Sequence, residues 1–138
     1  MQILDIYTDG GSRGNPGRSA IGVVIGDKEY REYIGETTNN VAEYKAVVFA
    51  LKKAKHLLGK KGLENTKITV HLDSQLVASQ LQGKYKILEP DLQSLFMEIW
   101  NLKFSFPYLE FCYIPREKNK KADRLVNEAL DQQQLTIH

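Results

Sequence analysis

The hydrophobic pattern at the start of the chain predicts strands. Residues 2–8, 19–25 and 30–34 are short apolar-rich runs bounded by turn-forming residues, which is typical of strands. The sequence Gly-Asp-Lys-Glu at 26–29 favours a hairpin between the second and third runs. Segment 10–18 is rich in glycine and contains a proline, so we expect a tight loop there. Together these runs predict an antiparallel meander of three strands.

After residue 40 the apolar positions recur with helical spacing. Val47, Leu51 and Leu58 lie on one stripe of a helix predicted over about residues 41–58, and its candidate N-caps are Thr38, Asn39 and Asn40. The later pattern predicts, in order, a strand at 67–72, a helix at 74–82, a helix from Pro90, a strand at 108–114 and a helix from near Lys118. This order predicts an α/β fold: a mixed five-stranded sheet, three antiparallel strands then two parallel ones, flanked by helices.

The composition is that of an ordinary globular domain. The chain has 138 residues, 42% hydrophobic and 26% charged, so we treat 1–138 as a single domain with about 131–138 as a C-terminal tail. No apolar run approaches the ~20 residues of a membrane span, and the start lacks signal-peptide features, so no membrane partner is expected. The single cysteine, Cys112, fits a cytoplasmic location. No sustained heptad pattern is present, so we expect a monomer, and the net charge of +2 permits a nucleic-acid partner.

Four carboxylates interrupt the apolar pattern at the ends of elements: Asp9, Glu43, Asp73 and Asp123. Asp9 and Asp73 end predicted strands, whereas Glu43 and Asp123 lie at the starts of predicted helices. Each also has an ordinary structural explanation, because acids start turns, cap helices and compensate helix dipoles. Glu43 is the most informative, since its neighbours three and four residues on belong to the buried stripe of its helix. We expect all four at one edge of the sheet.

Acids gathered at one edge favour a divalent-metal site. Like charges repel one another unless cations neutralise them. Carboxylate oxygens are hard ligands, which suit Mg²⁺ or Mn²⁺ better than zinc. The three histidines, His56, His71 and His138, are not spaced with acids or cysteine as zinc ligands are.

Four sequence blocks carry a resemblance to a known family. They are YTDGGSRGNPG from Tyr7, TTNNVAEYKAV from Thr37, LDSQLV from Leu72 and KADRLVNEAL from Lys121. In this order and spacing they resemble the type 1 ribonuclease H family, and the resemblance covers essentially the whole chain. The first two blocks are the most specific.

The resemblance implies an endonuclease that hydrolyses the RNA strand of RNA–DNA hybrids. It implies two Mg²⁺ or Mn²⁺ ions per active site and products with 5′-phosphate and 3′-hydroxyl ends. By matched position, the catalytic and metal-binding acids are Asp9, Glu43, Asp73 and Asp123. The matched substrate-binding residues are Ser12, Gly14, Asn15, Thr38, Asn39, Asn40 and Gln75, whose amide and hydroxyl groups suit the RNA 2′-hydroxyl and backbone phosphates.

Two features depart from many family members. The loop before the last acid, PREKNKK, has no histidine, as in the family's histidine-lacking branch. Arg116 is the candidate replacement, and an arginine can hold phosphate but cannot shuttle protons. A long basic protrusion is also absent, because only GKYKILE separates the third block from the next helix.

Three alternatives bear on this interpretation. A dinucleotide-binding site fails, because glycines at 11, 14 and 17 do not give the G-x-G-x-x-G spacing and a predicted strand follows. A catalytically inactive hybrid- or RNA-binding module of the same fold stays open, although binding alone gains nothing from four acids near phosphate. Double-stranded RNA also stays open as a further substrate.

Overall fold

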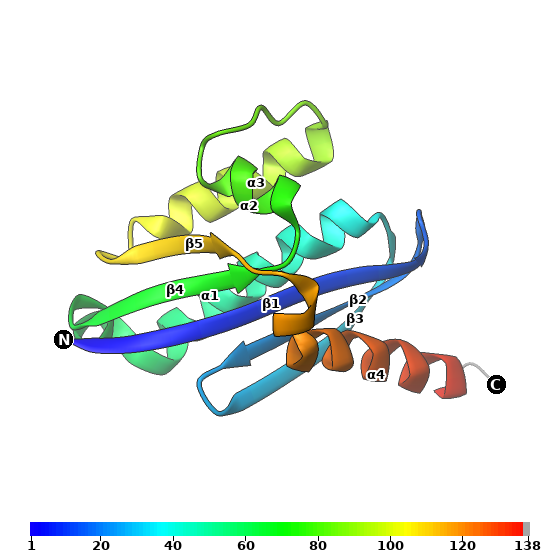
Figure 1. The fold of residues 1–138 in the computed structure, drawn as a ribbon, viewed down its shortest axis with the longest axis horizontal. Coiled ribbons are helices and arrows are strands. Elements are labelled where there is room, and N and C mark those ends of the chain that lie inside the picture. Colours follow the sequence, from blue (N-terminus) through cyan, green and yellow to red (C-terminus); the bar gives the residue numbers. More distant parts are fainter. Residues whose placement is uncertain (137–138) are drawn as a thin grey trace.

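Five strands form one mixed sheet in the computed structural model, which describes residues 1–136, with side chains through Gln134 (Figure 1). The strands are β1 Gln2–Gly14, β2 Gly17–Ile25, β3 Lys28–Thr37, β4 Thr66–Leu72 and β5 Leu109–Tyr113. Their order across the sheet is β3-β2-β1-β4-β5. The first three are antiparallel, and β4 and β5 run parallel to β1. The predicted α/β fold is confirmed.

Helices cover both faces of this sheet. They are α1 Asn39–Glu64, α2 Gln75–Leu81, α3 Pro90–Lys103 and α4 Lys120–Thr136, with the 3-10 turn η1 at Arg116–Lys118 before α4. Figure 1 shows α1 behind the sheet and α4 in front of it. The main core fills the space between sheet and α1, where Ile6, Val70, Val47 and Leu51 are fully buried. Among the described residues, no helix has the length and apolarity needed to cross a membrane.

The prediction of a tight loop at 10–18 was wrong. β1 continues through Gly14 and pairs with β2 from Ile6, opposite Ile25, to Gly14, opposite Gly17. The turn contains only Asn15 and Pro16. Within this segment Gly10 brings β1 close to α1, since a Cβ added to it would lie 2.2 Å from the Ala42 carbonyl carbon. On β2, Gly22 approaches α4 as closely, with an added Cβ 2.2 Å from the Ala122 carbonyl oxygen. Glycine content misled the prediction because close packing, and not only a turn, requires the missing side chain.

Two helices extend beyond their predicted ends. The N-cap of α1 is Thr38, whose Oγ1 accepts a hydrogen bond from the Val41 N–H at 3.2 Å. α1 changes direction at Gly59, where φ is +67°, and then continues to Glu64. α4 reaches Thr136, so most of the segment predicted as a tail is helical, and residues 137–138 lie outside the described part.

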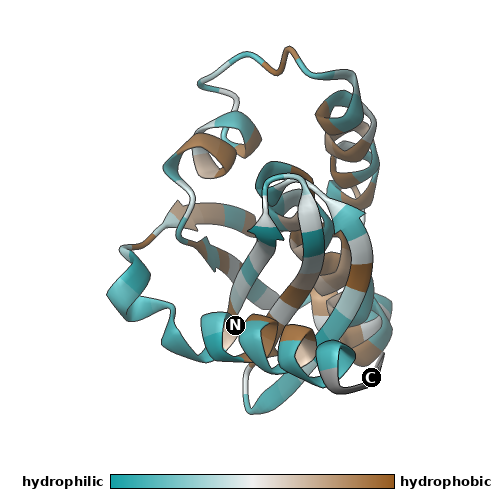
Figure 2. Ribbon diagram, turned by 90° about the vertical axis from the view of Figure 1, so that its right-hand side faces the viewer, coloured by the Kyte–Doolittle hydropathy of each residue, from teal (hydrophilic) through white to brown (hydrophobic). Residues whose placement is uncertain are grey.

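The α4 face of the sheet is held differently. Its apolar contact is a small cluster of Ala20, Val126, Ala129 and Leu130, with Tyr33 packed against it. Figure 2 shows that α4 carries both hydrophobic and strongly hydrophilic residues. The hydrophilic ones form ion pairs with the strands: Arg31–Glu128 at 2.7 Å, Arg124–Glu29 at 3.0 Å and Arg13–Asp131 at 2.7 Å.

Candidate metal centre and active site

Three of the four predicted carboxylates meet at one edge of the sheet. One carboxylate oxygen from each of Asp9, Glu43 and Asp73 lies within 4.8 Å of the other two. β1 and β4 are parallel neighbours with Thr8 opposite Leu72. Asp9 and Asp73, the next residue in each segment, therefore lie side by side. Glu43 reaches them from the start of α1. Asp9 and Glu43 are each only 7% exposed, which sets them apart from surface acids.

Gly10 explains why Asp9 and Glu43 lie so close together. A Cβ added to Gly10 would lie 2.2 Å from the Ala42 carbonyl carbon and 2.5 Å from the Glu43 nitrogen. Any other residue would therefore push β1 away from α1. The Gly10 backbone N–H also hydrogen-bonds the carboxylates of Asp9 and Glu43.

Asp73 is not the N-cap of α2. Helix capping, the structural explanation that the sequence offered for this acid, therefore does not apply. Ser74 has that role, because its Oγ accepts a hydrogen bond from the Val77 N–H at 3.2 Å. Asp73 Oδ2 instead accepts a hydrogen bond from Asn119 Nδ2 at 2.9 Å.

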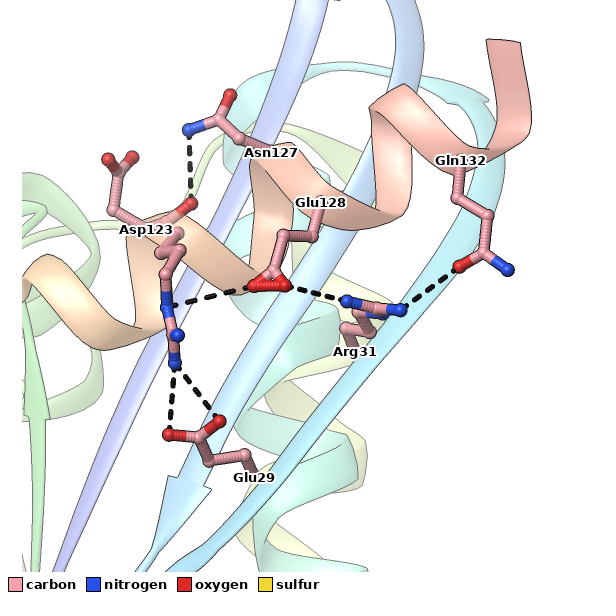
Figure 3. Close-up of polar contacts among 7 residues, drawn as sticks. Glu29, Arg31, Asp123, Asn127, Glu128 and Gln132 are labelled. Carbon is pink, nitrogen blue, oxygen red and sulfur yellow. Dashed lines mark hydrogen bonds and ion pairs between the residues drawn. The ribbon is translucent and has the colours of Figure 1, made fainter. Parts of the chain in front are cut away.

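Asp123 stands apart from the other three acids. It lies in the first turn of α4, is exposed, and lines the same cavity as the three without joining their close cluster. Figure 3 shows its side chain pointing away from the ion pairs that Arg124 and Arg31 form with Glu128 and Glu29. The expected quartet is thus three close carboxylates and a fourth across the cavity.

The clustered acids hold protons more tightly than isolated ones. Burial raises the pKa of Glu43 well above its usual value, and the charges of Asp9 and Asp73 raise it further. Burial is also the first cause that raises the pKa of Asp9 to about 7, followed by the charge of Asp73. Binding a proton therefore relieves the repulsion that a divalent cation would otherwise neutralise.

The donor set fits a hard divalent cation. Among the described residues, Glu43 Oε2 is buried without a hydrogen-bond partner. A buried polar atom normally has a partner, and a bound cation would supply one here. The close cluster consists of carboxylates alone, as Mg²⁺ and Mn²⁺ prefer.

An open cavity of about 390 Å³ lies over the acids. Several residues predicted from the sequence line it: Asp9, Ser12, Asn39, Asn40, Glu43, Asp73, Arg116 and Asp123. Arg116 comes from η1 and is exposed. A guanidinium group can hold a phosphate oxygen, whereas none of the described histidines lines the cavity.

The other predicted substrate residues lie around the cavity and outside its lining: Gly14, Asn15, Thr38 and Gln75. Asn15 Oδ1 accepts a hydrogen bond from the Asn39 N–H at 3.0 Å, and Asn39 Oδ1 accepts one from the Ser12 N–H at 2.9 Å. These bonds fix the β1–β2 hairpin against the start of α1. Only the amide oxygens are used in them, so both amide nitrogens can donate to a ligand.

The sequence interpretation missed Asn119. This residue is 1% exposed and directly precedes α4. Asparagine is common just before helices, but among the described residues the Asn119 Oδ1 accepts no helix N–H and its amide nitrogen bonds Thr8 and Asp73 instead, so the sequence held only a weak signal. It was overlooked because the helix was expected to begin near Lys118, one residue earlier.

The chain is similar to a known protein family and to several known proteins. The family model described as "Reverse transcriptase-like" matches residues 7–129. The bifunctional protein Rv2228c of Mycobacterium tuberculosis is 37% identical over 138 residues, covering 95% of this chain and 36% of that protein. The chain thus spans about a third of the length of this relative. Ribonuclease HI of Halobacterium salinarum is 40% identical over 131 residues, covering 91% of this chain and 63% of that protein.

Solved structures agree with the fold. The crystal structure of LC11-RNase H1 in complex with RNA/DNA hybrid superposes with a TM-score of 0.88 at 49% sequence identity. The match covers 94% of this chain and 97% of that one. The similarity therefore extends over nearly the whole chain.

Proposed function

Because the chain belongs to the type 1 ribonuclease H family, we propose that it is an endonuclease hydrolysing the RNA strand of RNA–DNA hybrids. The observation that carries the proposal is the cluster of Asp9, Glu43 and Asp73, within 4.8 Å of one another on an open cavity. The hybrid bound by the similar LC11-RNase H1 supports the choice of substrate.

The four acids would hold two Mg²⁺ or Mn²⁺ ions at the cavity floor. Bound there, the ions would supply an activated water and neutralise charge on the phosphate and the leaving 3′-oxygen. Asp9, Glu43 and Asp73 offer a rigid set of oxygens from two neighbouring strands and the start of α1. Asp123 offers an exposed carboxylate on the same cavity. An exposed metal ligand would leave room for substrate to reach the ions.

The amide and hydroxyl side chains around the cavity would bind the hybrid. A 2′-hydroxyl both donates and accepts hydrogen bonds, and an amide can do the same toward it. Asn39 and Asn40 lie beside the acids, and Asn15 is fixed next to Asn39. Arg116 would hold a phosphate oxygen with its charged donors. Recognition would follow backbone shape and the 2′-hydroxyl, without a preferred sequence.

The test is cleavage of an end-labelled RNA–DNA hybrid with Mg²⁺ or Mn²⁺. We expect cleavage by the wild type, products with 5′-phosphate and 3′-hydroxyl ends, and a loss of at least about 100-fold in Asp73→Asn. The matched control is Asp91→Asn, an exposed acid in the first turn of α3, which should cleave like the wild type.

Two outcomes would contradict the proposal: no cleavage by the wild type, or equal cleavage by Asp73→Asn. Hybrid binding without cleavage would favour the inactive binding module of the same fold. A parallel double-stranded RNA substrate decides whether that duplex is cleaved as well.

A further inference from the structure

Asn119 joins three acid-bearing segments of the chain. Its Nδ2 donates hydrogen bonds to the Thr8 carbonyl oxygen and to Asp73 Oδ2, both at 2.9 Å. Its backbone carbonyl oxygen accepts a hydrogen bond from the Asp123 N–H at 3.1 Å. One residue thus contacts the strand residue before Asp9, the Asp73 carboxylate and the helical turn that carries Asp123.

The chemistry of this position requires an amide nitrogen. The two side-chain partners are both acceptors, a carbonyl and a carboxylate oxygen. A neutral NH₂ group has two N–H bonds and can serve both at once, whereas a hydroxyl has one and a carboxylate has none. Because both partners accept, the orientation of the amide is fixed by the contacts themselves.

Asn119 has no access to substrate. The residue is only 1% exposed, and it does not line the cavity over the acids. Among the described residues its Oδ1 is buried without a hydrogen-bond partner. A buried unpaired oxygen is unfavourable, so the two hydrogen bonds from Nδ2 hold the side chain in this orientation although its Oδ1 gains no partner.

We propose that Asn119 is a positioning residue that presents Asp73 to a divalent cation and sets the distance from Asp73 to Asp123. One Asp73 oxygen is held toward Asn119, and the remaining lone pairs of the carboxylate are left for the cation. The inference rests on the proposed function in that it takes the acids to be metal ligands. It adds a residue that touches neither substrate nor metal.

The first test measures Mn²⁺ binding by calorimetry on the folded 138-residue chain, without substrate. We expect Asn119→Ala to bind Mn²⁺ about tenfold more weakly than the wild type. In the Asp73→Asn variant, adding Asn119→Ala should change the Mn²⁺ affinity by less than about twofold. The reason is that the Asp73 carboxylate, through which Asn119 acts, is already lost. Affinity within twofold of the wild type in Asn119→Ala would overturn the proposal.

The second test separates positioning from general destabilisation. We expect Asn119→Ala to need more Mn²⁺ for half-maximal hybrid cleavage while KM for the hybrid stays within about twofold. Ile99→Val removes a buried methylene on α3, away from the acids, and should lower the melting temperature without changing Mn²⁺ affinity. If Ile99→Val weakens Mn²⁺ binding as much, Asn119 has only a general structural role and the proposal is wrong.

Folding and function remain separable in these tests. Thermal unfolding is recorded for each variant, and Asn119→Ser, which keeps one donor, replaces the alanine variant if that one does not fold. We expect Asn119→Ser to bind Mn²⁺ more weakly as well, because one hydroxyl cannot serve both acceptors. A wild type that binds Mn²⁺ but cleaves no hybrid would refute the proposed function only, and the affinity comparison would still decide the role of Asn119. A wild type that binds no Mn²⁺ would overturn both.

Discussion

The two faces of the sheet hold their helices by different forces. On one face, α1 packs through a continuous apolar cluster in which Val47 and Leu51 are fully buried. On the other, α4 rests on a small cluster around Leu130 and is tied to β3 by exposed ion pairs such as Arg31–Glu128. Burial of apolar side chains contributes about 1.5–3 kcal/mol each, whereas exposed ion pairs contribute about 0–1 kcal/mol. The α1 face is the more firmly held of the two.

This difference divides the acids in the same way. Glu43 belongs to α1 and meets Asp9 across a direct contact between strand and helix backbones at Gly10. Asp123 belongs to α4, and its carboxylate is exposed. The comparison teaches that three acids rest on the large apolar core, while the fourth sits on a helix held by a smaller apolar cluster, one close backbone contact at Gly22 and salt-sensitive ion pairs.

The largest effect is expected where β1 touches α1. Gly10→Ala would place a Cβ 2.2 Å from the Ala42 backbone, so we expect a loss of about 3 kcal/mol or more in the free energy of unfolding. Gly11→Ala is the matched change toward α4, where the Cβ meets only the Val126 Cγ1 at 3.3 Å. We expect it to cost less than about 1 kcal/mol. Urea unfolding of both variants measures the difference, and equal losses would contradict the comparison.

An effect of opposite sign is expected at Asp9. Burial and the charge of Asp73 raise its pKa from the ordinary 3.8 to about 7, so the native state binds its proton more tightly than the unfolded state. Stability of the metal-free protein should therefore fall as pH rises from about 4 to 7. Removing the charge by Asp9→Asn should raise the free energy of unfolding at pH 8 by up to about 4 kcal/mol and leave it nearly unchanged at pH 4.

Thermal unfolding at several pH values without divalent cations checks this prediction. Asp91→Asn, an exposed acid, serves as the control and should show no such gain. Added Mg²⁺ should stabilise the wild type at pH 8 and have little effect on Asp9→Asn, because ligand binding favours the native state. Destabilisation of Asp9→Asn at pH 8 would show that its carboxylate is not strained in the metal-free protein.

The smallest effect concerns the ion pairs of α4 in Figure 3. Glu128→Gln removes the 2.7 Å contact with Arg31, and we expect a loss below about 1 kcal/mol that disappears in 1 M salt. The control is Glu98→Gln, which removes the 2.8 Å pair with Lys52 between α1 and α3. Both variants should lose similar stability. Only Glu128→Gln should raise the Mg²⁺ concentration needed for cleavage, and the same rise in Glu98→Gln would contradict a special role of α4.

The sequence predicted the fold and the clustered acids because both follow local rules. Periodicity located the strands and helices, and the placement of Glu43 on the buried stripe of its helix already indicated an unusual acid. The long β1–β2 hairpin was not predictable, because Gly10, one of the glycines that suggested a loop, is required by a helix that packs from 32 residues farther along the chain. The bridge from Asn119 to Thr8, 111 residues away, depends on the finished topology, which no local pattern encodes.

The position of β1 at the centre of the sheet has a consequence for how the protein opens. From Ile6 to Thr8, β1 pairs with β2 on one side and β4 on the other, so the backbone just before Asp9 becomes accessible to solvent only when the sheet separates. Amide hydrogens there should exchange with solvent at the rate set by global unfolding. Amide hydrogens in the last turns of α4 can exchange through local unfolding of that helix alone. A molecule in which α4 has detached would keep three of its acids assembled and lose the fourth.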